Sequence, residues 1–390
     1  MRRLAATAGV TVVGELVQQR HRPDPTTLIG KGKVDELRGL RQTTEAQVVV
    51  FDDPLTPAQQ RNLERLLECK VIDRSALILD IFAQHARSTE GKLQVEVAQL
   101  QYLLPRLTRQ WTHLSRLGGG VGTRGPGETQ LEVDRRRLRE RLAQLRRRLG
   151  DVERTRRLHR QERTLAPCPT VALVGYTNAG KSTLMNRATA AGVLVQDQLF
   201  ATLDPTVRRL RLPGGLPALL VDTVGFIHKL PHQLIEAFKS TLEQVGQADV
   251  LVHVVDVSHS AWREHVAVVE TVLADIGAGD RPVVFAFNKI DRLEAGARPQ
   301  LTGRDGERVS ARSGTGIEAL LLQIGTCLER HLTRVDCVLT AQDGDALSLI
   351  RRAGRVLAEE YVDGDAHVSA LVPSGVAGRL RRFTAKGTAA

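Results

Sequence analysis

Gly175-Tyr176-Thr177-Asn178-Ala179-Gly180-Lys181-Ser182 is the stretch that decides the fold. It follows the apolar run 170–174, which predicts a buried strand that leads through a glycine loop into a helix. The two glycines allow the backbone to curl so that successive N–H groups face a phosphate. Lys181 supplies a point charge for the β- and γ-phosphates, and the Ser182 hydroxyl can ligate Mg²⁺. The stretch therefore predicts a phosphate loop in a doubly wound sheet, and it suits ATP as well as GTP.

Peptides further along the chain predict which base is bound. In Asn288-Lys289-Ile290-Asp291, the Asp291 carboxylate can accept two hydrogen bonds from the ring N–H and the exocyclic amine of guanine. Adenine lacks this donor pair, and an unpaired carboxylate of this kind discriminates by about 10⁴-fold. We expect Asn288 and Lys289 to brace the pocket and the Ser310-Ala311 backbone to meet the guanine carbonyl. An ordinary exit from the strand 283–287 is the alternative for the tetrapeptide, but the ordered set of peptides favours guanine.

Two segments between these peptides are predicted to be switch loops. In 200–206, Thr202 is our choice for the second Mg²⁺ ligand, with Thr206 as the competitor. Asp222 is expected to hold the ion through water, and the Gly225 N–H is expected to sense the γ-phosphate. Loss of that phosphate would release both loops, so that hydrolysis becomes a conformational signal.

Phe226 occupies a position where many such enzymes carry a glutamine that orients the attacking water. A phenyl ring cannot do this, so we expect slow unassisted turnover, at ~10⁻³ s⁻¹ or below. A partner or an ion would then supply the missing stabilisation. The Asn178 amide is a candidate for holding K⁺ against the phosphates, and the alternative is that it only braces the loop. His228 and His232 are interpreted as surface residues and not as bases.

The candidate residues can be gathered by role. Those expected to act in catalysis are Lys181, Thr202, Gly225 and Asn178, and the expected metal ligands are Ser182 and Thr202. The expected set for binding GTP or GDP is Gly175, Tyr176, Thr177, Asn178, Ala179, Gly180, Lys181, Ser182, Phe200, Ala201, Thr202, Leu203, Asp204, Asp222, Thr223, Val224, Gly225, Asn288, Lys289, Ile290, Asp291, Ser310, Ala311 and Arg312.

Composition sets the broad class. A chain of 390 residues exceeds one core, so we expect about two to four domains. The hydrophobic share of 42% and the charged share of 25% are typical of a soluble globular protein. No run reaches membrane-spanning length, and the start lacks a signal-peptide core. The 4 cysteines lack C-x-x-C spacing, which predicts reduced, mostly buried thiols in a cytoplasmic protein. We also expect a monomer, with partly peripheral membrane association as the alternative location.

The net charge of +11 is concentrated in one segment. Between positions 131 and 164, 13 arginines outnumber 6 acidic residues. Because arginine forks suit phosphate, a nucleic-acid partner is the favoured interpretation. A solvated helix face with internal ion pairs is the alternative.

The chain outside the phosphate-loop domain predicts three further modules. Strands and helices alternate in the first hundred residues, which predicts a small parallel α/β module. Two leucine stripes with heptad spacing then flank the glycine-rich segment 118–129, which predicts an antiparallel helical hairpin with a flexible tip, kinked at Pro105. The last module is predicted to be a small α/β domain. The predicted limits are 1–92, 93–166, 167–334 for the nucleotide domain and 335–390.

The predicted elements are as follows. In the first module the strands are 10–16, 48–51 and 71–72, the helices are 33–41, 57–68 and 75–85, and 30–33 is a strand-to-helix turn. In the nucleotide domain the strands are 170–174, 210–212, 219–221, 250–257 and 283–287, and the helices are 234–245, 262–276 and 316–328. In the last module a strand at 338–339, a helix at 346–359, a strand at 367–372 and a helix at 374–382 are expected.

With these motifs in hand, the chain resembles the HflX family of translational GTPases, of the Obg-HflX-like class. The resemblance rests on Gly125-Pro126-Gly127-Glu128-Thr129-Gln130-Leu131-Glu132 and on the segments 28–34, 77–84 and 91–107. The segments 175–183, 200–206 and 222–226 match as well. The resemblance implies a further strand and helix before 4–16, so we expect the first sheet to lack an edge strand.

The resemblance also implies a role. It implies binding to the large ribosomal subunit, with the hairpin near the peptidyl-transferase region, and GTP-dependent splitting of stalled ribosomes or a part in their assembly. The arginine-rich arm fits contact with ribosomal RNA. An RNA-remodelling ATPase and a non-catalytic, GTP-gated recruitment switch are the alternatives from other functional classes.

Overall fold

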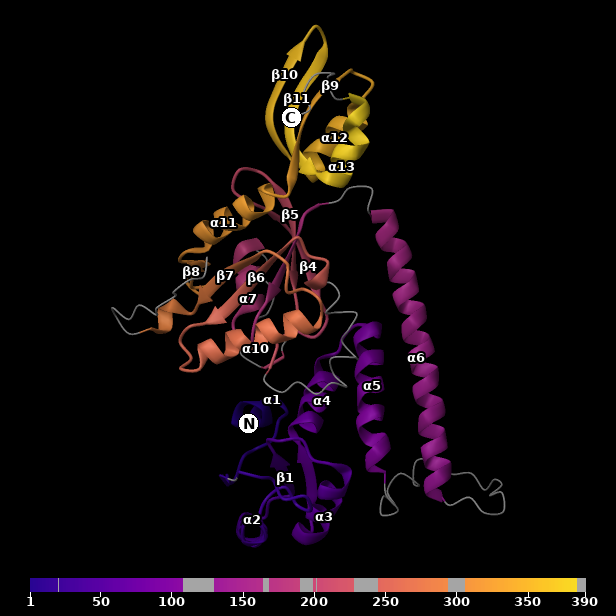
Figure 1. Ribbon diagram of the computed structural model, residues 1–390, viewed down its shortest axis with the longest axis vertical. Coiled ribbons are helices and arrows are strands. Elements are labelled where there is room, and N and C mark those ends of the chain that lie inside the picture. Colours follow the sequence, from indigo (N-terminus) through magenta and orange to yellow (C-terminus); the bar gives the residue numbers. More distant parts are fainter. Residues whose placement is uncertain are drawn as a thin grey trace. The chain divides into compact units, whose positions relative to one another are not determined.

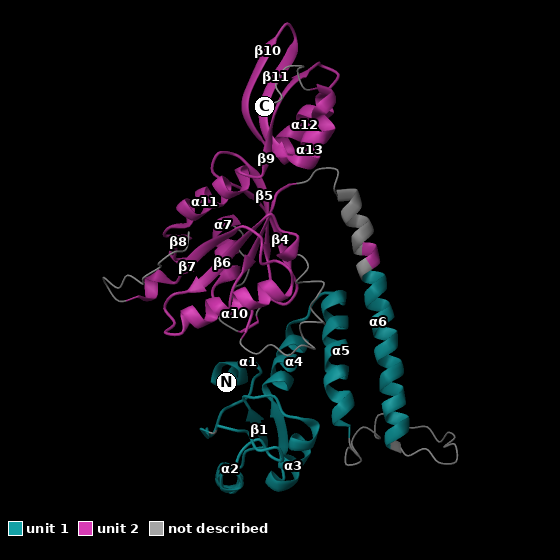
Figure 2. Cartoon of the chain, viewed as in Figure 1, with its two compact units in different colours: residues 1–152, 230–238 teal, residues 153–229, 239–390 magenta. Residues whose placement is uncertain are grey.

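A six-stranded, mostly parallel sheet is the largest element of the computed structural model, which is a mixed α/β chain (Figure 1). The structure describes residues 1–19, 21–107, 130–163, 168–189, 199–200, 202–227, 245–293 and 306–383. The chain divides into two compact units, which meet in sequence between Val152 and Glu153 (Figure 2).

The strand order of the large sheet is β4-β5-β3-β6-β7-β8, and only β4 runs antiparallel to its neighbour. The central strands form because they are continuous apolar runs buried on both faces, as parallel strands require. Their carboxyl ends therefore lie along one edge of the sheet, where doubly wound sheets bind ligands. The bounds are β3 Thr170–Val174, β4 Thr206–Arg211, β5 Pro217–Asp222, β6 Val250–Asp256, β7 Val283–Asn288 and β8 Gly306–Arg308, which confirms the five predicted strands.

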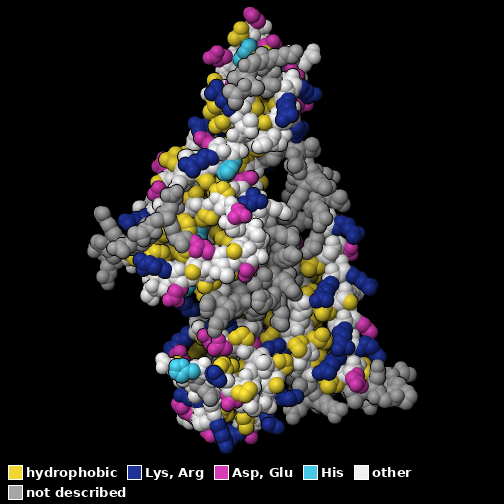
Figure 3. All heavy atoms as spheres, viewed as in Figure 1, with side chains coloured by type: hydrophobic (Ala, Val, Ile, Leu, Met, Phe, Trp, Pro, Cys, Tyr) yellow, Lys and Arg dark blue, Asp and Glu magenta, His cyan; other side chains and the backbone are white. Residues whose placement is uncertain are grey.

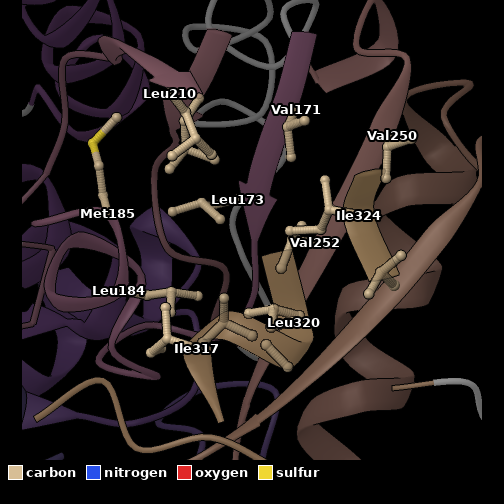
Figure 4. Close-up of a cluster of buried hydrophobic side chains, with 14 of the residues drawn as sticks. Val171, Leu173, Leu184, Met185, Leu210, Val250, Val252, Ile317, Leu320 and Ile324 are labelled. Atoms are coloured by element: carbon tan, nitrogen blue, oxygen red, sulfur yellow. The ribbon is translucent and has the colours of Figure 1, made fainter. Parts of the chain in front are cut away.

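Helices cover both faces of this sheet. On one face, α7 (Lys181–Thr189) and α11 (Ile317–Glu329) pack on alternate residues of the central strands. Figure 4 shows Leu320 and Ile324 of α11 near Val252 of β6, and Leu184 of α7 near Ile317. On the other face, α10 (Trp262–Asp275) packs on the intervening residues of β6 and β7. The predicted helices 262–276 and 316–328 are thereby confirmed. The predicted helix 234–245 lies almost wholly outside the described residues.

The first unit contains a two-stranded parallel sheet of β1 (Val48–Phe51) and β2 (Lys70–Asp73). The predicted helices are confirmed as α2 (Lys31–Thr44), α3 (Pro57–Leu67) and α4 (Arg74–His85), and a short α1 (Arg2–Thr7) precedes them. A capping box of Thr56 and Gln59 fixes the start of α3. Leu63, Leu67 and Val71 form the buried centre of this module.

The predicted strand 10–16 is wrong. The segment has no regular structure, and Val10, Val12 and Val13 are between 38% and 54% exposed. No strand lies beside it among the described residues, so its backbone lacks the ladder that a strand needs. The predicted turn at 30–33 does start a helix, because Gly30 is the N-cap of α2. The segment before it carries an isolated bridge between Asp24 and Leu28 and no strand.

The two predicted hairpin arms are helices α5 (Thr89–Leu103) and α6 (Gln130–Arg163). Leu142 and Leu145 of α6 pack with Val97 of α5, and Arg141 pairs with Glu96 at 2.8 Å. Arg135 donates to the Leu107 carbonyl at 3.0 Å, so residue numbers rise on one arm as they fall on the other. The arms are therefore antiparallel. The α-helix ends before Pro105, in the 3-10 turn η1 (Leu104–Arg106), and the glycine-rich tip lies outside the described residues.

The last module is a three-stranded antiparallel sheet of order β10-β11-β9 with helices packed on it. One prediction here is wrong, since the predicted helix 346–359 ends at Ala353 and residues 355–362 form a strand. A Cβ at Gly354 would collide with the Leu371 carbonyl oxygen, and β10 then pairs along β11. The elements are β9 Leu332–Leu339, α12 Gly344–Ala353, β10 Arg355–Val362, β11 Asp365–Pro373, α13 Ser374–Leu380 and the 3-10 turn η4 Arg381–Phe383.

A matched pair of leucines on α11 tests the core of the large sheet. Leu320 is 1% exposed and Leu322 is 51% exposed. We expect Leu320→Ala to lower the free energy of unfolding by about 2–5 kcal/mol, because it leaves a cavity under the sheet. Leu322→Ala should change it by less than about 0.5 kcal/mol. Urea unfolding followed by circular dichroism measures both, and equal losses would place the core elsewhere.

Candidate nucleotide site

The phosphate loop connects β3 to α7 and crosses the carboxyl end of β6. Gly175 has φ +153° and Gly180 has φ +99°, and a Cβ at either would collide with the Val254 carbonyl oxygen or the Asn288 amide. Asn178 holds a left-handed conformation at φ +60°. These positions explain why the sequence places glycine at both ends of the loop. The loop is thus shaped by close contacts with a backbone carbonyl of β6 at Gly175 and with a side-chain amide of β7 at Gly180.

Lys181 is buried at the start of α7. Its Nζ donates to the carbonyls of Gly175 and Tyr176, each at 3.3 Å. Burial lowers the pKa of this lysine to about 8, although the nearby Asp222 carboxylate opposes the shift. A phosphate beside the ammonium group would favour its charged form. The side chain is therefore held where the prediction requires a phosphate ligand.

Three oxygen-bearing side chains meet beside Lys181. The Ser182 hydroxyl donates to Asp222 Oδ2 at 2.6 Å, and Thr202 donates to the same oxygen at 3.0 Å. The two hydroxyl oxygens are 2.8 Å apart. Asp222 Oδ1 is buried without a hydrogen-bond partner among the residues that the structure describes. Hard oxygen donors and a buried, unsatisfied carboxylate oxygen fit Mg²⁺.

The electrostatics of Asp222 agree with a cation site. Burial raises the pKa of this carboxyl, and the Lys181 charge with the two hydroxyl donors acts in the opposite direction. A divalent cation would favour the ionised form. Thr206, the competitor of Thr202, begins β4 and pairs with Asp222 in the ladder. The structure thus brings the Thr202 hydroxyl into the cluster and puts Thr206 in a strand.

The segment after Asp222 closes against the phosphate loop. Thr223 donates to the Leu173 carbonyl at 2.6 Å, and Val224 is buried. The Phe226 N–H donates to the Gly175 carbonyl at 3.1 Å, and the Thr177 N–H donates to the Phe226 carbonyl at 2.6 Å. The Phe226 ring is 1% exposed, so it fills the core and presents no group to water.

The predicted switch residues near Thr202 are placed in part. The Phe200 N–H donates to the Thr177 hydroxyl at 3.2 Å, and Leu203 is buried. Asp204 is half-buried. Ala201, His228 and His232 lie outside the described residues.

The expected base pocket lies at the ends of β7 and β8. Asn288 donates to the Ala179 carbonyl at 2.8 Å, and Lys289 donates to the Asn178 carbonyl at 2.8 Å. Both side chains therefore contact the phosphate loop, whereas the sequence analysis expected them to brace the base pocket. Asp291 lies in the 3-10 turn Ile290–Arg292, and the Ser310 hydroxyl donates to it at 2.6 Å.

One expected donor has a protein partner. The Ala311 N–H, expected to meet the guanine carbonyl, donates to Asn288 Oδ1 at 2.9 Å. Arg312, next along the loop, accepts a hydrogen bond from Arg187 at its carbonyl.

Sequence reasoning missed three contributors to this pocket. Arg187 of α7 donates to the Ala311 and Arg312 carbonyls, and no local motif marks it. Asp256 pairs with Lys289, and its position at the end of a buried strand could have indicated it. His265 of α10 stacks on Tyr176 with ring centroids 3.8 Å apart. These contacts join elements far apart in sequence, so only the fold reveals them.

Comparisons with known proteins match the chain along its length. Residues 1–83 match the family model described as GTP-binding GTPase N-terminal, and 85–163 match its Middle Region. Residues 170–289 match the model described as 50S ribosome-binding GTPase. A protein named GTPase HflX from Lacrimispora saccharolytica is 47% identical over 95% of this chain and 88% of its own length. Another from Escherichia coli K12 is 48% identical over 94% and 87%.

The chain belongs to the HflX family of GTPases. It therefore binds guanine nucleotide and hydrolyses GTP, as the sequence motifs predicted. Among solved structures, a GTP-binding protein from Sulfolobus solfataricus in complex with GDP is similar at 24% identity. The match covers 84% of this chain and 94% of that one, with a TM-score of 0.45.

Three further findings concern the described residues of this HflX-family chain. No helix in the described part of the chain combines the length and the apolar character that a membrane crossing requires. The cysteines Cys69, Cys168, Cys327 and Cys337 are free thiols, but only Cys337 is buried, so the prediction that most of them are buried is wrong. Within the same described ranges, no cluster of three or more His, Cys, Asp or Glu side chains is suited to a metal.

Gly225 offers a test of the closed arrangement. A Cβ there would lie 2.7 Å from Thr177 Cα and 3.1 Å from Lys181 Nζ. We expect Gly225→Ala to lower stability by about 1–3 kcal/mol, because backbone must move to admit the methyl group. Gly325→Ala is the control, since a Cβ there meets nothing within 4 Å in helix α11. The control should leave the melting temperature unchanged or raise it. A similar rise for Gly225→Ala would contradict the close approach of Gly225 to Thr177 and Lys181.

Proposed function

We propose that this HflX-family GTPase binds GTP with Mg²⁺ at the phosphate loop and acts on the large ribosomal subunit, in splitting stalled ribosomes or in their assembly. The meeting of Ser182, Thr202 and Asp222 beside Lys181 is the observation that carries the nucleotide site. The match of residues 170–289 to a 50S ribosome-binding GTPase model supports the ribosomal partner.

In this proposal each part of the pocket has a role in the reaction. Lys181 binds the β- and γ-phosphates, and Asp291 selects guanine. Ser182 and Thr202 would hold Mg²⁺, with Asp222 behind them, and the ion would neutralise charge that develops on the phosphates. The Gly225 N–H reports the γ-phosphate. Phe226 is buried and supplies no water-orienting group, so turnover depends on stabilisation from a partner or from K⁺ held by Asn178.

Helix α6 supports RNA as the ribosomal contact. Arg139, Arg146 and Arg147 are exposed on it, and Figure 3 shows Lys and Arg side chains gathered along the described part of α6. The buried leucines of the same helix pack on α5, and these three arginines are left exposed to solvent. Guanidinium groups bind phosphates of RNA in a salt-dependent manner.

Hydrolysis with purified subunits tests the ribosomal role. We expect large ribosomal subunits to raise GTP turnover by about tenfold or more, in line with partner stimulation of other slow GTPases. Arg139→Glu/Arg146→Glu/Arg147→Glu should abolish the stimulation and leave basal turnover unchanged. The control variant replaces three other exposed basic residues, Arg61, Arg65 and Lys70, by glutamate. Absence of stimulation in both K⁺ and Na⁺ would reject the ribosomal role, whereas ATPase activity that survives Lys181→Ala would favour the RNA-remodelling ATPase.

The metal assignment is tested by magnesium dependence. We expect Ser182→Ala to raise the Mg²⁺ concentration for half-maximal GTP turnover by about tenfold, because one of few protein ligands is lost. Ser313→Ala, in the loop that follows β8, is the control for loss of a hydroxyl. An unchanged Mg²⁺ requirement in Ser182→Ala would show that the ion binds elsewhere.

A further inference from the structure

The ammonium group of Lys289 lies between two loops of the nucleotide pocket. It donates to the Asn178 carbonyl at 2.8 Å and to Asp256 Oδ2 at 2.6 Å, and its side chain is only 12% exposed. Lys289 itself is left-handed, with φ +68°. A non-glycine residue is found in this conformation when its surroundings hold it there. The contacts of the side chain are therefore part of what fixes this backbone.

Asp256 is built to receive that ammonium group. It is the last residue of β6 and pairs with Asn288 at the end of β7. Its Oδ1 accepts from the Ser258 hydroxyl at 2.6 Å and from the Ser258 N–H at 3.1 Å, which leaves Oδ2 directed to Lys289. The carboxylate is 16% exposed, so the ion pair is largely shielded from solvent. Shielded, charge-assisted contacts are stronger than pairs on the surface.

We propose that Asp256 is a positioning residue for guanine-nucleotide binding, which acts through Lys289. Without the carboxylate, Lys289 keeps one carbonyl partner and its ammonium group gains by turning to water. Asn178 would then lose its link to the base-binding turn, and Asp291 would lose the fixed left-handed residue two positions before it. The phosphate loop and the 3-10 turn that carries Asp291 would no longer be held at a fixed distance from each other. This inference rests on the proposed pocket and adds a residue to it.

Asp256→Asn tests the inference because it keeps the shape and removes the charge. We expect the dissociation rate of a fluorescent GDP analogue and the KM for GTP to rise by about tenfold, as for loss of one buried hydrogen bond to a charged group. At saturating GTP the kcat should stay within about twofold, since the brace serves ground state and transition state alike. Asp275→Asn, an exposed residue at the end of α10, is the control for the change in charge.

A double-mutant cycle shows whether the effect passes through Lys289. In a Lys289→Met background, Asp256→Asn should raise GDP dissociation by less than about twofold, because the partner is already absent. If the fold-increases in GDP dissociation rate of the two single variants multiply in the double variant, Asp256 acts independently of Lys289. If Asp256→Asn does not fold, Ser258→Ala serves instead, with an expected rise of about threefold from loss of one neutral hydrogen bond. An unchanged rate in the available variant overturns the inference.

Lys181→Ala separates this inference from the pocket on which it rests. If Lys181→Ala retains GDP affinity, the pocket assignment itself is wrong, and the proposed role of Asp256 is rejected together with it. If Lys181→Ala loses nucleotide while Asp256→Asn binds it like Asp275→Asn, the pocket stands and only the role of Asp256 is refuted.

Discussion

The buried carboxylate of Asp222 is the constraint on which the nucleotide site depends. It ends β5, accepts hydrogen bonds from Ser182 and Thr202, and lies near the ammonium group of Lys181. The end of β5, the start of α7 and the segment that carries Thr202 are thereby joined at one buried carboxylate. Such a group is costly to bury unless cations and donors surround it.

The fold was predictable where burial leaves a simple pattern. Strands β3, β6 and β7 are continuous apolar runs, and the glycine positions between β3 and α7 are set by contacts that exclude any Cβ. Strand β10 was missed because Arg355–Val362 follows a helix and contains Leu357, Glu359 and Glu360, which also suit a helix. Its strand character comes from pairing with β11. The prediction for segment 10–16 failed in the opposite way, since its valines suit a strand but no strand pairs with it among the described residues.

The candidate site was predictable residue by residue, because each motif carries its chemistry in a few adjacent positions. The contacts between motifs were not. Arg187 reaches a loop more than a hundred positions away, and Asp256 meets Lys289 across two strands. The Ala311 N–H donates to Asn288, which sequence could not indicate, since both residues are also suited to the base. Sequence thus predicts the groups expected to face the nucleotide, and the fold shows the contacts between them.

The lowered pKa of Lys181 has a chemical consequence. An amine with a pKa of about 8 is largely unprotonated in mildly alkaline solution, whereas ordinary lysines remain ammonium ions there. Binding of a phosphate beside this amine in mildly alkaline solution would therefore be coupled to the uptake of one proton by Lys181.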